Sequence, residues 1–309
     1  MKNIICIPFA FKDGFNSGVN IKTNNTVEIY LKNAVVALLS AKWNNPDCKV
    51  VFATNISSNV IPKKFLQKLL ENDIEIIRVE FNTYKFPAEY KWSLAFYKLC
   101  VLKTLIDRGF DCCCYLDTDV YVQGNFDSIW EECKYKILLY DINHGLDVVE
   151  YRTISEEINN FVGEEIFATH YGGEFFAASY ENAVVFEKEL NAIYCEMINR
   201  NYQTTKGDEF LISIAADRCK MLIKNASPYV GRFWTGASFR LVSSNYQFNP
   251  VAVLHMPAEK ERGIIKLYNL YFSKGKIPNK EIVWRICRLS RRNPLEILGV
   301  KLRNILKNC

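Results

Sequence analysis

Two carboxylates, Asp117 and Asp119, directly follow a run of five largely apolar residues at positions 112–116. Residues two apart on a strand point to the same side, so these two acids would lie close together. Neighbouring carboxylates repel each other unless a cation lies between them. A hard divalent ion such as Mg²⁺ or Mn²⁺ removes that repulsion and also binds phosphate oxygens. The spacing therefore predicts a metal clamp for a diphosphate group, with a solvated turn as the alternative.

The elements that would hold these aspartates can be predicted from the pattern of apolar residues. Short apolar runs predict strands at residues 4–9, 49–54, 74–79 and 112–116. Helical spacing predicts helices at residues 26–43, 62–70 and 92–106. This alternation is typical of βαβ units, and therefore of a mostly parallel sheet covered by helices. Ligands of such sheets lie at the carboxyl ends of the strands, which is where Asp117 would stand.

The second half of the chain is less regular. Its patterns predict strands at residues 136–140, 174–178 and 251–254, and helices at residues 180–200 and 208–216. Asp208 and Glu209 begin the last of these helices, where acids are also expected as partners of the helix dipole. Gly172 and Gly173 precede a strand, where they would let the backbone approach a ligand or form a tight turn.

Residues 116–120, Leu-Asp-Thr-Asp-Val, resemble the DxD motif of GT-A-fold glycosyltransferases. The similarity is greatest to the family-8-like enzymes that build bacterial lipopolysaccharide, capsule and O-antigen. The order of further features agrees with it: Gly-Gly-Glu at 172–174, Asp-Glu at 208–209 and a late histidine at 255. The resemblance covers residues 1–260. It implies a GT-A fold, which is a Rossmann-like, mostly parallel open sheet flanked by helices.

The resemblance also implies the metal site and the catalytic residues. Asp117, Asp119 and His255 are the expected ligands of Mn²⁺ or Mg²⁺, and a neutral imidazole that completes two carboxylates suits Mn²⁺. Asp208 and Glu209 are the expected catalytic pair near the anomeric carbon of the donor sugar. Glu209 departs from the family, which usually has Gln at this position, and an acid there would bind a hydroxyl or act as a base.

A nucleotide-sugar pocket is implied in the same way. Its expected residues are Phe9, Ala10, Lys98, Asp117, Gly172, Gly173, Glu174 and Lys260. The family usually has Gly at the third and Lys at the sixth position after the histidine, whereas here Lys260 is at the fifth and no such Gly is present. Trp234 is the expected contact for the acceptor sugar, with burial in the core as the alternative.

Positive charge is concentrated at the C-terminal end. Seven Lys and Arg residues and two acids lie from residue 281 to residue 309, so this segment carries the whole formal charge of +5. The balanced charge of the preceding residues argues against a nucleic-acid-binding surface. We therefore expect a GT-A domain at residues 1–265 and a basic amphipathic tail at 266–309. This tail would contact the anionic inner membrane surface, or else pack on the domain.

The sequence also favours a cytoplasmic location, with peripheral contact to the inner face of the membrane. The apolar run at residues 4–10 is followed by Phe-Lys-Asp-Gly, which is not a signal-peptide cleavage site. No stretch approaches the ~20 apolar residues of a membrane span. The 11 cysteines, three of them adjacent at 112–114, are an odd number without a CxxC pair. We expect them to be reduced and buried like small apolar residues.

These features together predict a metal-dependent hexosyl- or N-acetylhexosaminyltransferase. Its donor would be a nucleotide-diphosphate sugar, most simply a UDP-sugar, and its acceptor a glycan or lipid-linked glycan. A haloacid-dehalogenase-like phosphatase, whose first motif is also Asp-x-Asp after an apolar strand, is one alternative; Asp117 would then be a nucleophile. A non-catalytic carbohydrate-binding protein on a transferase-like fold is the other.

Overall fold

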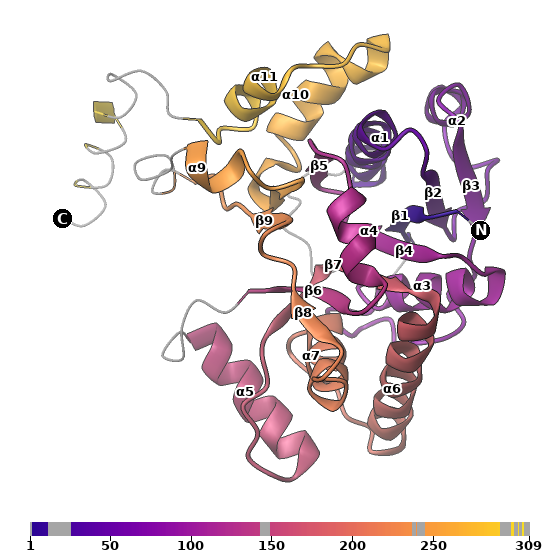
Figure 1. Ribbon diagram of the computed structural model, residues 1–309, viewed down its shortest axis with the longest axis vertical. Coiled ribbons are helices and arrows are strands. Elements are labelled where there is room, and N and C mark those ends of the chain that lie inside the picture. The colour runs from indigo at the N-terminus through magenta and orange to yellow at the C-terminus, as the bar shows by residue number, and fades with distance from the viewer. Residues whose placement is uncertain are drawn as a thin grey trace.

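A computed structural model describes residues 2–11, 26–142, 149–236, 239, 245–290, 298, 299, 302 and 305. Residues 12–25, which include Gly14 and Gly18, and most of the tail beyond residue 290 lie outside the described residues. Figure 1 shows an α/β arrangement in which helices cover a central sheet. This confirms the fold class expected from the sequence at the level of a mostly parallel sheet flanked by helices, compatible with a Rossmann-like fold.

The central sheet has seven strands in the order β3-β2-β1-β4-β7-β6-β8. Their bounds are β1 Ile4–Phe9, β2 Lys49–Thr54, β3 Ile74–Arg78, β4 Cys112–Leu116, β6 Ile137–Asp141, β7 Tyr171–Ser179 and β8 Ile223–Asn225. Neighbouring strands are parallel except at β7, which is antiparallel to both β4 and β6. The four strands predicted in the first half are confirmed, since short apolar runs covered on both faces have few other stable conformations.

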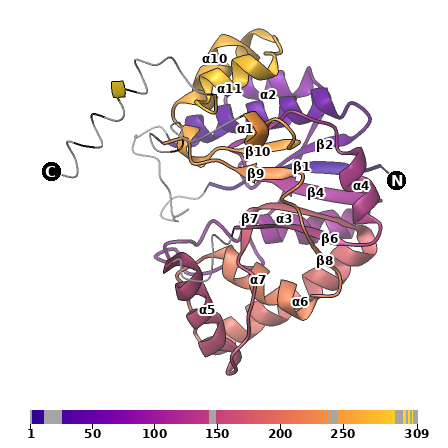
Figure 2. The ribbon, with the colours of Figure 1, turned by 60° about the vertical axis from the view of Figure 1, so that its left-hand side comes forward.

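Helices cover both faces of this sheet (Figure 2). One face carries α1 Thr26–Asn44, α2 Lys63–Leu70, α10 Gly263–Leu270 and α11 Lys280–Ile286. The other carries α3 Tyr97–Arg108, α5 Val149–Val162, α6 Tyr180–Asn199 and α7 Asp208–Arg218. The shorter helices are α4 Asp127–Cys133, α9 Asn245–Phe248, and the 3₁₀ turns η1 Pro257–Glu259 and η2 Phe272–Lys274. No helix among the described residues has both the length and the apolar character that crossing a bilayer requires.

Alternate side chains of the strands enter two separate cores, one on each face of the sheet. Cys112 and Cys114 belong to the core that includes α1, whereas Cys113 and Tyr115 belong to the core that includes α3 and α6. This alternation explains the adjacent cysteines as small apolar side chains in a strand buried on both faces. The ten cysteines in the described part of the chain are free, and eight of them are buried. Burial raises the pKa of the Cys113 and Cys114 thiols.

A second, smaller sheet is formed by three segments far apart in the sequence. Its strands, in the order β5-β10-β9, are β5 Val120–Val122, β10 Val253–His255 and β9 Val230–Arg232. β10 runs antiparallel to β5, which pairs His255 with Val120, and parallel to β9, which pairs His255 with Arg232. The predicted strand at 251–254 is therefore shifted to 253–255, and the strand pairing brings the end of β10 beside the Asp-x-Asp segment.

Two predicted elements have different bounds in the structure. The helix predicted from residue 92 begins at Tyr97, because the amides of Ser93 and Ala95 donate to carbonyls only three residues earlier, as in turns. Gly172 and Gly173 lie inside β7 rather than in a turn before it. The reason is that the pairing of β7 with β6 extends to Tyr171, which lies opposite Asp141.

The first part of the expected basic tail is packed on the domain. Val283, Trp284 and Leu289 are buried in the same core as α1, and the indole N–H of Trp284 donates to Gln123 Oε1 at 2.9 Å. Helix α10 also packs along α1. The apolar residues of this part of the tail therefore face the protein core.

Candidate functional site

The Asp-x-Asp segment lies where the two sheets meet. Asp117 directly follows β4, and its amide donates to the carbonyl of Glu174 on β7 at 3.0 Å. Asp119 directly precedes β5, and its carbonyl accepts from the amide of Met256 at 3.0 Å. His255 is the last residue of β10. Backbone pairing on both sides therefore holds the two acids beside the histidine at the carboxyl end of a central strand.

Asp117, Asp119 and His255 form a group that can hold a metal ion. Each offers one ligand atom, and these atoms all lie within 4.8 Å of one another. Asp119 Oδ2 lies 3.3 Å from His255 Nε2, yet this buried oxygen makes no hydrogen bond of normal geometry. A buried carboxylate oxygen without such a bond is expected where a cation completes the site. Two carboxylates and one imidazole fit a divalent metal ion, so the residues present are suitable ligands.

Two lysines neutralise the acids. Lys260 Nζ lies 3.3 Å from Asp119 Oδ2 and 5.6 Å from the ring centre of Tyr30. Lys98 Nζ lies 2.9 Å from Asp117 Oδ1 and donates to the carbonyl of Gly173 at 2.8 Å. Each candidate ligand carboxylate therefore has its own ammonium group, and both lysines line the same cavity as the acids.

The charges of this group shift its pKa values strongly. Burial opposes ionisation of Asp119, but Lys260 and His255 lower the pKa of this carboxyl well below its usual range. Burial would lower the pKa of His255, but its ion pair with Asp119 raises that pKa to about 9. Without a metal, therefore, His255 carries a proton that metal binding would have to displace.

The predicted catalytic acids lie at the start of α7 and face the same cavity. Asp208 is buried, and its Oδ2 lies 3.2 Å from Lys98 Nζ. Burial raises the pKa of Asp208 to about 6, against the opposing charge of Lys98. Glu209 differs: its Oε2 lies 3.0 Å from His170 Nε2 and its Oε1 lies 3.2 Å from Arg232 Nη2. Although burial favours the neutral form, these two partners lower the pKa of Glu209.

Arg232 and His170 were not selected by sequence analysis. Arg232 is the last residue of β9, and it forms ion pairs with Glu174 at 2.8 Å and with Glu209 at 3.2 Å. Burial raises the pKa of Glu174, but the charge of Arg232 dominates and brings it to about 2. The three-residue strand β9 has no periodicity of its own, so the sequence carried no local signal for Arg232.

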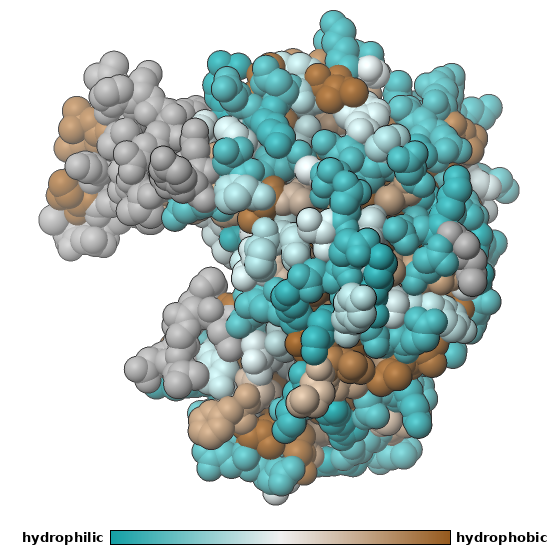
Figure 3. All heavy atoms as spheres, in the orientation of Figure 1, coloured by the Kyte–Doolittle hydropathy of each residue, from teal (hydrophilic) through white to brown (hydrophobic). Residues whose placement is uncertain are grey.

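One cavity of about 650 Å³ brings most of the predicted site residues together. Eleven of them line it: Phe9, Ala10, Lys98, Asp117, Asp119, Gly173, Asp208, Glu209, Trp234, His255 and Lys260. Gly172 and Glu174 are not among the lining residues. In the space-filling view the left-hand outline of the molecule is notched between the regions of α9 and α5 (Figure 3).

Aromatic residues occupy the part of this cavity next to β1. The ring of Phe9 stacks on that of Tyr30, with centroids 5.4 Å apart, and Tyr30 also lines the cavity. Trp92 lines it as well, and Trp234 is half exposed, which places it at the surface rather than in the core. The cavity thus combines aromatic faces, ammonium groups and a cluster of acids.

The absence of a side chain at Gly173 makes room for the cluster of Lys98 and Asp208. A Cβ at this position would lie 2.0 Å from Asp208 Oδ2 and 2.9 Å from Lys98 Nζ. Both distances are too short for a real contact. The sequence suggested that the two glycines allow close approach of a ligand, whereas Gly173 here allows close approach of two functional side chains.

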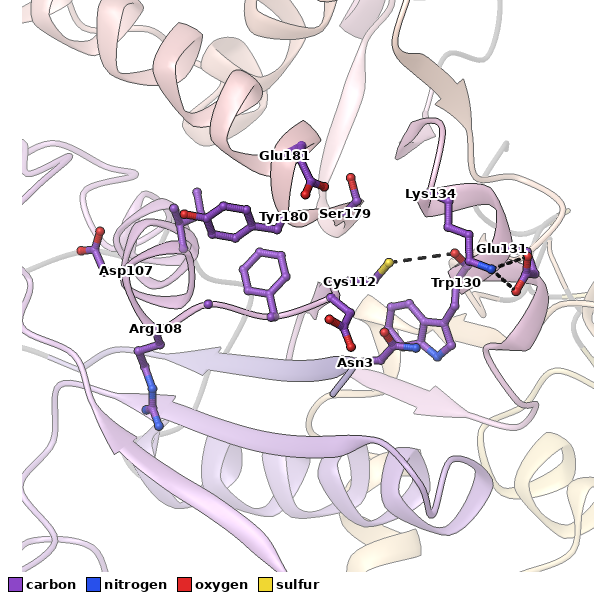
Figure 4. Close-up of a pocket in the computed structure, with 14 residues that line it drawn as sticks. Asn3, Asp107, Arg108, Cys112, Trp130, Glu131, Lys134, Ser179, Tyr180 and Glu181 are labelled. Atoms are coloured by element: carbon purple, nitrogen blue, oxygen red, sulfur yellow. Dashed lines mark hydrogen bonds and ion pairs between the residues drawn. The ribbon is translucent and has the colours of Figure 1, made fainter. Parts of the chain in front are cut away.

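A second and larger cavity, of about 950 Å³, lies at the opposite end of β4 (Figure 4). Its walls include Asn3, Cys112 and Trp130. Glu131 forms an ion pair with Lys134 on the same helix turn at 2.7 Å, so these charges are paired with each other. Because the metal-binding group and the strongly shifted acids lie in the other cavity, we assign the candidate active site there.

A scan against models of protein families and a search of the curated proteins found no match to this chain.

Proposed function

We propose that this protein is a metal-dependent glycosyltransferase of the GT-A type, which moves a sugar from a nucleotide-diphosphate sugar to a glycan or lipid-linked glycan. The observation that carries the proposal is the group formed by Asp117, Asp119 and His255 in a cavity that also presents Lys98 and Lys260. A cation site and ammonium groups together would balance the negative charge of a diphosphate. The donor is proposed to be a UDP-sugar and the metal Mn²⁺ or Mg²⁺.

The proposed roles follow from position in the cavity. The bound metal would neutralise the negative charge that grows on the departing diphosphate. Lys260, beside Asp119, would contact the phosphate groups, and the aromatic faces of Phe9 and Tyr30 would border the base. Trp234, half exposed at the cavity, would contact the acceptor sugar.

Asp208 and Glu209 would act on the sugar in different ways. Asp208 lines the cavity, and its Oδ2 faces Lys98 at 3.2 Å but has no hydrogen bond of normal geometry, so this oxygen would accept a bond from a sugar hydroxyl. Both oxygens of Glu209 contact His170 or Arg232, which makes it a fixed negative charge and a weak base. A fixed carboxylate would stabilise positive charge at the anomeric carbon in an oxocarbenium-like transition state.

The proposed location is the cytoplasmic face of the membrane. Buried Val283 and Trp284 are not available to lipid, so membrane contact would rest on the basic residues and the apolar residues beyond position 290. Undiminished binding to anionic vesicles after removal of the residues beyond position 290 would contradict this assignment of the contact to the tail.

A thermal-shift screen of nucleotide sugars with Mn²⁺ or with a chelator tests the proposal. Saturation to about 100 times the dissociation constant adds about 2.7 kcal/mol of stability, which raises the melting temperature by roughly 5 °C. We expect this rise for a UDP-sugar with Mn²⁺, its loss with chelator, and its loss in Asp119→Asn. Asp107→Asn, an exposed acid of α3 outside this cavity, is the matched control.

Three results would contradict the proposal. The absence of a shift with every nucleotide sugar would exclude the donor site. Trapping of a phosphoryl group on Asp117 after incubation with a phosphomonoester would favour the phosphatase instead. Binding of Mn²⁺ and UDP-sugars without turnover by any glycan acceptor would favour the non-catalytic alternative.

A further inference from the structure

We propose that Glu174 is the positioning residue of His255: it binds one ring nitrogen and so directs the other toward the metal. The inference rests on the proposed metal site but extends it to a residue outside the cavity wall. Sequence analysis assigned Glu174 to the nucleotide-sugar pocket. In the structure its side chain is buried next to His255 instead, and it does not line the cavity.

The two ring nitrogens of His255 face two different carboxylates. Nδ1 lies 3.3 Å from Glu174 Oε1, and Nε2 lies 3.3 Å from Asp119 Oδ2. Both Glu174 and His255 are buried, so water does not compete for these contacts. With Nδ1–H donated to Glu174, the lone pair on Nε2 points toward the candidate ligand oxygens. A carboxylate bound to the far nitrogen of a ligand histidine fixes the tautomer and the ring orientation.

Arg232 holds Glu174 in place for this contact. Its Nε lies 2.8 Å from Glu174 Oε1, and its Nη2 lies 3.1 Å from Oε2. The guanidinium therefore spans both oxygens of the carboxylate, an arrangement that limits rotation of the group. The same Nη2 contacts Glu209, so Arg232 also joins the positioning carboxylate to one of the predicted catalytic acids.

Gly172 provides the space that Glu174 needs. A Cβ at position 172 would lie 1.9 Å from Glu174 Oε2 and 2.7 Å from its carboxyl carbon. The two residues are separated by one position on β7 and face the same side of the strand, so only glycine leaves room for the folded-back carboxylate. This gives the first glycine of the Gly-Gly-Glu segment a function that does not involve a sugar.

The test measures binding of Mn²⁺ alone, by electron paramagnetic resonance of the free ion, so it does not depend on activity. Glu174→Gln keeps the shape but removes the charge, and we expect its Mn²⁺ affinity to fall about 10- to 100-fold. Gly172→Ala, which displaces the carboxylate, is expected to weaken Mn²⁺ binding in the same direction. Glu259→Gln is the matched control, because Glu259 is a buried carboxylate that contacts Thr235 and the amide of Gly263 and no candidate ligand.

A double-mutant cycle separates positioning from a general structural effect. In a His255→Ala background, Glu174→Gln should cause no further loss of Mn²⁺ affinity, since there is no ring left to position. An equal loss in both backgrounds would overturn the proposal. Failure of the natural chain to bind Mn²⁺ would refute the metal site itself, whereas normal Mn²⁺ binding by Glu174→Gln would refute only the role of Glu174.

A measurement on the natural chain provides an independent check if a variant does not fold. The protein has three histidines, so its imidazole nitrogens are readily distinguished by NMR. With Zn²⁺ as a diamagnetic probe, His255 should carry its proton on Nδ1. A proton on Nε2 of His255 in the metal-bound protein would contradict the proposal.

Discussion

The ammonium group of Lys98 lies 3.2 Å from Oδ2 of Asp208, and both side chains are largely enclosed. Burial nevertheless dominates over this attraction and raises the pKa of Asp208 to about 6, from an ordinary value of 3.8. The folded protein therefore binds a proton at Asp208 in a pH range where the unfolded chain has already released it. The contribution of Asp208 to stability therefore falls as the pH rises from about 4 through 6.

Replacement of Asp208 by Asn should remove this part of the pH dependence. The shift corresponds to about 3 kcal/mol, an upper value because the variant also removes one partner of Lys98. We expect Asp208→Asn to be more stable than the natural chain at pH 8 and equal to it at pH 4. Urea unfolding at both pH values measures the free energy of unfolding of the two proteins. If their difference in free energy were the same at pH 4 and pH 8, the assignment of this pH dependence to Asp208 would be wrong.

Lys260 is expected to act in opposite directions on the metal and on the nucleotide. Its ammonium group lies 3.3 Å from Asp119 Oδ2 and competes with a cation for that oxygen. Lys260→Gln should therefore strengthen binding of Mn²⁺ alone, up to about tenfold, while it weakens binding of UDP in the presence of Mn²⁺. Calorimetric titrations with each ligand provide the two affinities. Parallel changes would exclude a role of Lys260 at the phosphate groups.

Binding of Mn²⁺ should become stronger as the pH rises. The pKa of His255 is about 9 without metal, so its ring is protonated at pH 7 and must lose that proton to become a ligand. The expected change is about tenfold in affinity for each pH unit between 6.5 and 8. In His255→Ala this dependence should disappear, and a steep dependence in that variant would assign it to another group.

Gly173→Ala tests the packing around Lys98 and Asp208, the part of the cavity that is proposed to bind the donor sugar. The added methyl group would overlap Asp208 Oδ2 and the end of Lys98. We expect the UDP-sugar to lose at least about tenfold in affinity, whereas the affinity for Mn²⁺ alone should fall less, since the methyl group meets Asp208 and Lys98 first and reaches Asp117 only through its ion pair with Lys98. If the affinity for Mn²⁺ fell by the same factor as the affinity for the UDP-sugar, the metal-binding group and the region around Lys98 and Asp208 would not act independently.

Trp284→Ala tests the packing of the segment that follows α10. Trp284 is buried against Phe248, with ring centroids 5.1 Å apart, and donates to Gln123. Loss of a buried tryptophan should lower the free energy of unfolding by about 3–5 kcal/mol. Ile277→Ala, at an exposed position before α11, is the control and should change it by less than about 0.5 kcal/mol.

The first half of the fold could be predicted because each strand there is an apolar run with its own helix after it. The Asp-x-Asp pair could be placed because it follows such a run directly. His255 was found only through the order of motifs in a resembling family, since its strand has three residues. Gly172 and Gly173 were expected before the strand, either against a ligand or in a tight turn, because glycine usually interrupts a strand, and pairing with β6 outweighed that preference here.

The partners of the site residues could not be predicted in the same way. Arg232 lies two residues before Trp234 and His170 two residues before Gly172, but neither stands in a pattern of its own that indicates a site. Both reach Glu209, on α7, only through the folded arrangement. Polar networks of this kind depend on strand pairing between distant segments, which local patterns do not encode.

The three strands of the smaller sheet also determine when the candidate ligands can meet. Asp119 is carried by β5, but His255 arrives with β10, after more than a hundred intervening residues have been added to the chain. A growing polypeptide that ends before β10 contains the complete Asp-x-Asp segment and both of its carboxylates, but no imidazole beside them. The proposed metal site is therefore complete only after β10 has been added, when synthesis of the domain is nearly finished.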